Sequence, residues 1–356
     1  LRKCVDWYKS YYKKQFKMDI YKNYTTSLDR YEGKYKSKHW KKYDLRLDLF
    51  KTENLKNFRN NSLSDGLDDR YDISHQKKIF KNLIKEVGED YVLKNLNNQN
   101  IGNSKNVFKY KDKYVDGGQN FHIKWLYEFE KNIVNKKNIK SVCEIGGGYG
   151  SFAQKIIKRF NCKYVSIDLP EGNFLASYYL KNHFNDLSIV GNCELINNEL
   201  DETTFDKNDI FILNPWNKIS NIKFDLIINT RSMMEMDKDV IKYYFDFIHT
   251  HIKKDGFFLN INRYRKKSVG YPVHFYEYPY DSSWNIVLSK KSWRQYWIHF
   301  LLTQRSLNEK KNKIKEELIK IKRITYFFIL QEKLLELKKI IFIFLKKIIK
   351  FVLFMK

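Results

Sequence analysis

The stretch from Val142 to Gly150 reads V-C-E-I-G-G-G-Y-G and decides the fold class. A short apolar run ends in an acidic residue, a cluster of glycines follows, and residues 151–159 have helical spacing. This succession of strand, glycine turn and helix is typical of the corner at which doubly wound α/β folds bind nucleotide-like ligands. Glycine suits the corner because a residue without Cβ lets the backbone turn sharply and approach a ligand.

Strands and helices alternate downstream of this corner. We predict strands at residues 141–145, 164–167, 210–213, 225–229 and 257–261, and helices at residues 151–159, 173–183 and 238–251. One or two final strands near residues 285–288 would complete the sheet. Alternation of this kind predicts parallel βαβ crossovers, and therefore an α/β fold with a mostly parallel sheet of seven strands and helices on both faces.

The flanking regions differ from this central domain, which we place at residues 116–300. Residues 1–115 have helical spacing at 6–19, 76–87 and 91–96, which predicts a helical N-terminal region and a candidate substrate cap. Asp116-Gly117-Gly118 is predicted to be a turn, followed by an amphipathic helix over residues 120–133. Residues 301–356 are predicted to form a basic amphipathic helical tail.

The chain of 356 residues carries a net charge of +26, which indicates an acidic partner. Lysine is spread over loops and helices alike, so we interpret most of this charge as background and do not expect nucleic acid to be the partner. The four cysteines form neither a C-x-x-C motif nor a zinc-spaced cluster, and no secretory signal is visible. We therefore expect a reducing, cytoplasmic location and no metal site.

The tail has two readings. Residues 310–356 contain 14 basic and 4 acidic residues, and no stretch reaches the roughly 18 apolar residues that a spanning helix needs. A basic helix with an apolar face can lie on an anionic bilayer, which would place the protein at the inner face of the cytoplasmic membrane. The alternative is a helix that packs on the domain or on a partner.

The dinucleotide fingerprint G-x-G-x-x-G fits the glycine corner poorly. Counted from Gly146 and Gly148, the third glycine is replaced by Ser151. The pattern E-x-G-x-G-x-G, which begins at Glu144, fits better. A second acidic residue, Asp168, ends the second predicted strand, and a carboxylate at that place can accept two hydrogen bonds from a vicinal diol.

Four segments extend the match: E-I-G-G-G-Y-G-S-F-A, Y-V-S-I-D-L-P-E, F-D-L-I-I-N-T-R-S-M-M-E-M and F-L-N-I-N-R-Y. The first resembles motif I of class I S-adenosylmethionine-dependent methyltransferases, and the four in this order resemble the bacterial sugar O-methyltransferase family over about residues 120–284. The resemblance implies a Rossmann-like methyltransferase sheet, S-adenosylmethionine as cofactor, and methylation of a hydroxyl on a sugar of a surface glycan or its precursor.

The resemblance also implies roles for individual residues. In it, Asp168 contacts the ribose, Asn214 borders the adenine, and the acidic residue before the glycines orients the methionine end. The implied cofactor site consists of Glu144, Gly146, Gly147, Gly148, Gly150, Asp168, Leu169, Asn214 and Asn229. The implied acceptor site includes Ser232, Asn262 and Arg263.

Transfer to a hydroxyl requires a group that takes the acceptor proton, and we predict Glu235 or His122, with Arg231 beside the site. Each of these residues has a plainer explanation. An acidic residue near a helix start favours the helix dipole, and a single histidine more often packs or faces solvent. Asp168 could likewise cap the helix that follows it.

Two further functions remain open from the sequence, besides a binding protein with a vestigial site. The basic charge and many aromatic residues would suit an RNA methyltransferase, and the glycine corner would suit a dinucleotide-binding oxidoreductase. Asn214-Pro215-Trp216 resembles the N-P-P-Y element of amino-group methyltransferases. That element should follow the fourth strand, whereas this tripeptide follows the third, so we interpret Pro215 as a strand terminator.

Overall fold

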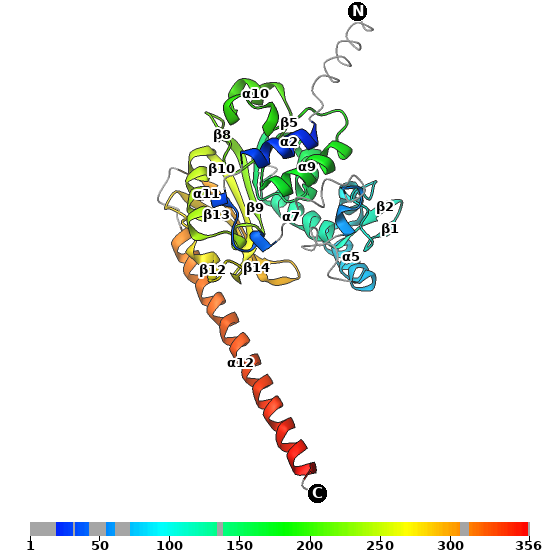
Figure 1. Ribbon diagram of the computed structural model, residues 1–356, viewed down its shortest axis with the longest axis vertical. Helices are drawn as coiled ribbons and strands as arrows, with labels where there is room; N and C mark the ends of the chain where they lie inside the picture. Colours follow the sequence, from blue (N-terminus) through cyan, green and yellow to red (C-terminus); the bar gives the residue numbers. More distant parts are fainter. Residues whose placement is uncertain are drawn as a thin grey trace, which may run out of the picture.

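A computed structural model describes residues 19–30, 33–42, 55–60, 72–133, 138–306 and 313–354. Its centre is a sheet of eight strands in the order β13-β14-β10-β9-β3-β4-β7-β5 (Figure 1). The six strands β10, β9, β3, β4, β7 and β5, in this order across the sheet, run parallel to one another. The strand β14 is antiparallel to both β10 and β13. The strands are β3 (Ser141–Ile145), β4 (Lys163–Ile167), β5 (Ile189–Gly191), β7 (Ile210–Leu213), β9 (Phe224–Thr230), β10 (Ile252–Arg263), β13 (Trp284–Ser292) and β14 (Gln295–Arg305).

Helices cover both faces of the sheet, so the predicted fold class is confirmed. One face carries α7 (Gly117–Ile133), α8 (Ser151–Phe160) and α9 (Pro170–His183). The other carries α10 (Glu202–Lys207), α11 (Lys238–His251) and the first part of α12 (Ile314–Phe354). The pleat of β3 divides its side chains accordingly, because Val142 packs in the first layer and Cys143 and Ile145 pack in the second.

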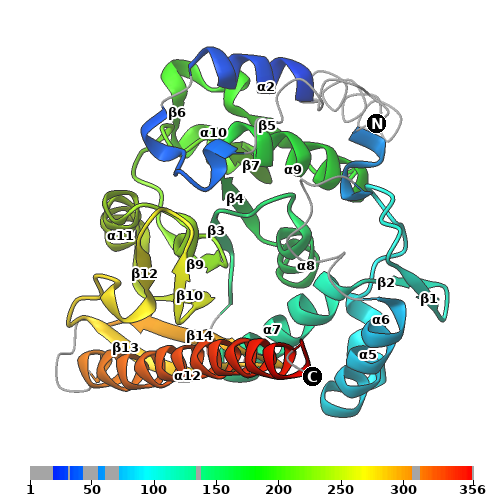
Figure 2. The same ribbon diagram turned by 60° about the horizontal axis from the view of Figure 1, so that its bottom comes forward.

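The N-terminal region packs along one side of this domain. The helix α2 (Ile20–Asp29) lies on α9, where the ring centroids of Tyr24 and Phe174 are 4.8 Å apart (Figure 2). The helices α5 (Ile73–Val87) and α6 (Glu89–Asn95) pack near α7 and confirm the helices predicted at 76–87 and 91–96. The predicted helix at 6–19 falls outside the described residues, except for Asp19. The hairpin of β1 (Phe108–Tyr110) and β2 (Lys113–Val115) was not predicted.

Three features differ from the prediction: a helix start, the number of strands and the end of the last strand. Asp116-Gly117-Gly118 is not a turn, because α7 begins at Gly117 and Asp116 accepts a hydrogen bond at 2.7 Å from the backbone N–H of Gln119. The sheet has one strand more than predicted, since β5 adds to its edge beside β7. The last strand continues to Arg305, beyond the boundary placed at residue 300.

Several short elements fill the connections. Within the described residues, no helix combines the length and the apolar character needed to cross a membrane. The short elements are η1 (Gly33–Tyr35), η2 (Trp40–Lys42), η3 (Phe58–Asn60), η5 (Asn192–Glu194), η6 (Ile196–Asn198), η7 (Met233–Glu235), η8 (Phe275–Glu277), β6 (Glu199–Leu200), β8 (Lys218–Ile219), β11 (Arg265–Lys267) and β12 (Pro272–His274).

Candidate functional site

The predicted site residues gather where four central strands end. Glu144 lies near the end of β3, Asp168 follows β4, Asn229 lies near the end of β9, and Asn262 lies near the end of β10. The chain passes from β3 to β4 on one side, while β9 pairs with β3 on the other. The strand order therefore reverses at β3, and open α/β sheets bind their ligands outside the carboxyl ends of strands at such a point.

The glycine turn after β3 is tight on one side and open on the other. Gly146, Gly148 and Gly150 have φ angles of +72°, +57° and +87°, which favour glycine over other residues. A Cβ on Gly146 would lie 1.9 Å from Oγ of Ser232, whereas a Cβ on Gly148 would have no atom within 4 Å. The backbone at Gly148 therefore borders open space that a ligand can occupy.

Two carboxyl groups flank this turn, that of the buried Glu144 and that of the partly buried Asp168. Asp168 accepts hydrogen bonds from the backbone N–H groups of Gly148 and Leu169, both at 2.7 Å, and burial raises its pKa to about 6. Oε2 of Glu144 accepts a hydrogen bond from the Tyr164 hydroxyl at 2.5 Å, and burial raises the pKa of Glu144 to about 7. Its other oxygen, Oε1, is buried and has no hydrogen-bond partner among the described residues. Such an atom favours a ligand that brings a donor.

The asparagines at the ends of β9 and β10 hold the loop beyond them. Asn229 donates to the carbonyl of Ile145 at 2.8 Å and accepts from the Met233 N–H at 3.1 Å. Asn262 donates to the side-chain oxygens of Asn229 and Asn260, at 2.7 and 2.6 Å. Since both side chains are fully buried, they fix the loop 231–235 against the glycine turn. Direct contact of Asn229 or Asn262 with a ligand stays a prediction.

Asn214 lies in a buried network that reaches Asp168 through Asn173, whose side-chain amide donates to the Asp168 carbonyl at 2.8 Å. Asn214 donates to Oγ of Ser27 on α2 at 2.9 Å, and its side-chain oxygen accepts from Asn173 on α9 at 3.0 Å. Its backbone N–H donates to Asn217 at 2.6 Å. The side chain thus joins the N-terminal helix to the sheet, and its predicted position beside an adenine stays a prediction.

Charged side chains gather on the loop after β9. Glu235 pairs with Lys266, and its Oε1 lies 3.8 Å from Nε2 of His39. Burial lowers the pKa of Lys266, and the nearby charges of Arg263 and Arg231 lower it further. The charges of Arg231 and Arg263 thus act on Lys266, the partner of Glu235. That the three residues Arg231, Glu235 and Arg263 form one site stays a prediction. Arg231 has a φ of +59°, and its N–H donates to the carbonyl of Ile261 at 2.7 Å.

Within the predicted cap of residues 1–115, segment 33–42 reaches this edge of the sheet, although none of its residues was predicted individually. Besides His39, it contributes Lys36, whose Nζ lies 2.5 Å from Oε1 of Glu171 at the start of α9. The ring of Tyr35 lies 5.3 Å from that of Tyr243 on α11. No local motif marks these residues, because their role depends on where a distant segment packs.

His122, the other predicted base, lies in a different environment. It is 4% exposed, its Nδ1 is 3.1 Å from Oγ of Ser151, and its ring packs 5.3 Å from that of Phe152. Burial lowers its pKa to about 3, with a smaller contribution from the charge of Lys155. The imidazole is therefore neutral at physiological pH and packed among rings. Its role as a base stays a prediction.

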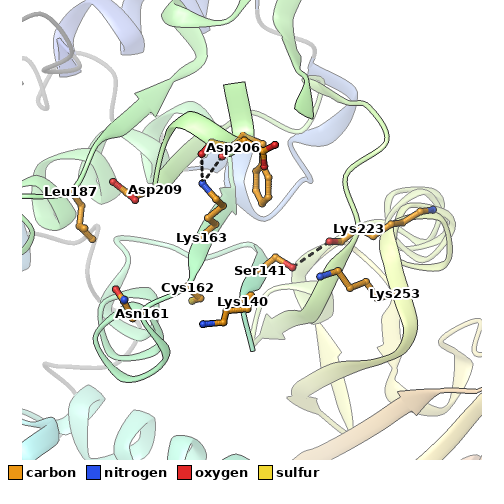
Figure 3. A pocket seen from close by; sticks show the side chains of 11 residues that line it. Lys140, Ser141, Asn161, Cys162, Lys163, Leu187, Asp206, Asp209, Lys223 and Lys253 are labelled. Atoms are coloured by element: carbon orange, nitrogen blue, oxygen red, sulfur yellow. Dashed lines mark hydrogen bonds between the residues drawn. The ribbon is translucent and has the colours of Figure 1, made fainter. Parts of the chain in front are cut away.

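A hollow of about 390 Å³ lies at the opposite, amino ends of the strands (Figure 3). Two of its lysines make hydrogen bonds or ion pairs within the protein. Lys163 donates to three carbonyls at the end of α10, each at 2.8 Å, and Lys253 pairs with Asp225 at 3.2 Å. Because parallel strands present ligand sites at their carboxyl ends, we assign the functional site to the glycine turn and not to this hollow. No cluster of three metal-ligating side chains occurs within the described ranges.

Comparison with known proteins gives similarity in structure only. No family model matches the sequence, and no curated protein matches it. The structure resembles a methyltransferase from Pyrococcus furiosus, with a TM-score of 0.34 and 14% identity over 51% of this chain and 82% of that one. It also resembles human N-acetylserotonin methyltransferase in complex with SAM, with a TM-score of 0.32 and 16% identity over 53% of this chain and 54% of that one. For mitomycin 7-O-methyltransferase the TM-score is 0.35 and the identity 14%, over 53% of this chain and 57% of that one. This chain thus spans little more than half of the latter two, and these values leave its substrate open.

Proposed function

We propose that this protein is an S-adenosylmethionine-dependent methyltransferase that methylates a hydroxyl group, on a sugar of a surface glycan or its precursor. A buried carboxyl group on β3 and a partly buried one directly after the neighbouring strand β4 lie beside an open glycine turn, and this arrangement carries the proposal. In this proposal Asp168 accepts hydrogen bonds from the ribose hydroxyls. Oε1 of Glu144, which has no partner among the described residues, accepts one from a donor at the methionine end. The sequence resemblance over residues 120–284 supports the same assignment.

The residues fit this cofactor on three counts. The backbone at Gly148 borders open space, Glu144 keeps a buried oxygen without a partner among the described residues, and the strand order reverses beside both. The cofactor supplies a methyl group already activated by its sulfonium. The protein therefore needs only to orient the acceptor oxygen and remove its proton.

We propose that the charged group around Glu235 binds the acceptor and takes its proton. Glu235, paired with Lys266 and near His39, ends the loop 231–235 that Asn229 and Asn262 hold against the glycine turn. We assign proton removal to Glu235, and binding of an anionic substituent on the acceptor to Arg231 and Arg263. The sugar acceptor rests on the sequence resemblance.

Calorimetry tests the cofactor. We expect the protein to bind S-adenosylhomocysteine and not NAD, and Asp168→Ala to weaken binding at least tenfold through lost hydrogen bonds to an ionised group. Binding of NAD without S-adenosylhomocysteine would favour an oxidoreductase and refute the proposal. Glu199→Ala, on the short strand β6 away from the glycine turn, serves as the control and should bind as wild type does.

Mass spectrometry of surface glycans tests the acceptor. Cells that carry Asp168→Ala in place of the native protein should yield a glycan lighter by one methyl unit. Re-expression of the wild-type chain should restore the lost mass. Unchanged glycans, together with intact S-adenosylhomocysteine binding by the wild type, would keep the cofactor assignment and refute the sugar acceptor.

A further inference from the structure

The first third of α12 belongs to the body of the protein. Ile314 and Ile321 are fully buried against the second layer of the core. Oγ of Ser289 on β13 donates to Glu317 at 2.7 Å, and the ring of Phe328 lies 5.3 Å from that of Tyr264. Among the described residues, the ion pair with the body that lies farthest along α12 joins Glu332 to Arg265, at 2.9 Å.

Beyond Glu332 the helix leaves the body and projects away from it (Figure 1). Its large apolar side chains are then exposed to a degree that is unusual for a folded protein. Leu335, Ile340 and Phe342 are 59%, 63% and 58% exposed. Single exposed apolar residues scattered over a surface are ordinary. Many of them close together on one helix indicate an interaction site.

One side of this outer part is mainly apolar, with Lys338 at its edge. Leu334, Leu337, Ile341 and Leu345 follow at intervals of three and four, which aligns them along this side of the helix. Lys339 and Lys346 are seven residues apart and share the other side. Leu335, Phe342 and Ile343 lie on the other side, among the lysines. Nζ of Lys346 lies 4.6 Å from the ring centroid of Phe342.

The positive charge of the outer part of α12 and the width of its apolar surface indicate which partner it binds. Residues 333–356 contain seven lysines and one acidic residue, so a second copy of the helix would bring like charges together. A two-stranded coiled coil also buries only a narrow seam and would leave Leu335, Ile340 and Phe342 in water. An anionic bilayer surface accepts both a broad apolar side and a basic one.

We propose that the outer part of α12, from residue 333 onward, binds the surface of anionic phospholipid membranes. The apolar side enters the boundary between headgroups and acyl chains, while Lys339 and Lys346 lie at the headgroup phosphates. The helix then holds the sheet and its site close to the bilayer. This inference does not depend on the proposed methyltransferase activity.

Sedimentation of the full chain with vesicles tests the proposal. We expect the protein to sediment with phosphatidylcholine vesicles that contain phosphatidylglycerol, and much less with pure phosphatidylcholine. The double variant Lys339→Glu/Lys346→Glu should bind at least about tenfold more weakly, because each lysine near an anionic surface contributes about 1 kcal/mol. Leu337→Gln/Ile341→Gln should weaken binding to a similar extent by removing apolar area.

The matched control is Lys81→Glu/Lys85→Glu, which changes net charge equally at two exposed positions on α5. It should bind vesicles nearly as the wild type does. Equal sedimentation with both vesicle types, or equal binding by the two lysine variants, would overturn the proposal. So would a stable dimer in ultracentrifugation that Leu337→Gln/Ile341→Gln dissociates, because the apolar side would then be covered by a second copy. The thermal midpoint of all variants should match the wild type, since none of these side chains packs in the core.

Discussion

Substitutions at Gly146 and Gly148, two glycines of the same turn, distinguish the effect of backbone strain from the effect of lost ligand contact. We expect Gly146→Ala to destabilise the fold by roughly 2–5 kcal/mol, because its Cβ would collide with Ser232 at a positive φ. Gly148→Ala should cost only about 1–2 kcal/mol, because its Cβ meets open space. Urea unfolding measures both.

The same pair tests where the ligand lies. If the cofactor occupies the open side of the turn, Gly148→Ala should weaken S-adenosylhomocysteine binding at least tenfold in calorimetry, although its fold is nearly intact. Unchanged affinity of this variant would show that the ligand does not lie against Gly148. Ser232→Gly combined with Gly146→Ala should recover part of the lost stability, because it removes the colliding atoms.

Glu144 makes the stability of the protein depend on pH. Burial raises its pKa from 4.5 to about 7, so the folded state holds the proton more tightly than the unfolded state. Its favourable contribution is therefore complete below about pH 4.5 and is lost as pH rises to about 7, with a total of about 3 kcal/mol. In urea unfolding between pH 5 and 7.5, Glu144→Gln should show a flatter pH dependence than the wild type. Parallel curves for the two proteins would contradict the raised pKa.

At the scale of elements, segment 33–42 completes the site from a distance. His39→Asn and Glu235→Gln should each abolish methylation of the surface glycan in cells while leaving S-adenosylhomocysteine affinity within about twofold of wild type. The expectation follows because both side chains lie in the charged group beyond the glycine turn and not on the turn itself. Calorimetry and glycan mass spectrometry measure the two properties.

The control for this pair is His274→Asn, whose partner Glu277 lies on η8. It should leave both properties unchanged. Loss of S-adenosylhomocysteine binding in His39→Asn would instead mean that the segment supports the cofactor site as a whole. Full methylation by Glu235→Gln would remove Glu235 as the group that takes the proton.

Elements with a strong local pattern were predictable from the sequence, whereas packing between distant segments was not. The strand β3 and the helix α11 have the predicted bounds, since an apolar run before glycines and a long amphipathic repeat are local signals. Gly117 and Gly118 predict a turn, whereas they begin α7, because Asp116 caps the helix there and tertiary contacts outweigh the low helix propensity of glycine. The approach of His39 to Glu235 joins residues 196 positions apart, and no local pattern encodes it.

At the scale of the whole molecule, the charge is less uniform than the sequence suggested. Several lysines of the body are matched internally, as Lys163 is by three carbonyls and Lys253 by Asp225. Residues 333–356, by contrast, contain seven lysines and only one acidic residue. These 24 residues carry a net charge of +6, a higher density than the +26 spread over all 356 residues, and they lie beside exposed apolar side chains of the described part of α12. This arrangement favours a membrane surface over nucleic acid.

The same contrast predicts a gradient of stability along α12, which hydrogen exchange can measure. Amides of residues 314–328 should exchange slowly, because that part of the helix packs on the core, whereas those of residues 333–343 should exchange faster by orders of magnitude. A helix without tertiary contacts is only marginally stable in water. Vesicles that contain phosphatidylglycerol should slow exchange in residues 333–343 and leave the central strands β3, β4 and β9 unchanged. Equal, slow exchange along all of α12 without vesicles would mean that the outer part is already held by protein, and the membrane would then not be needed to order it.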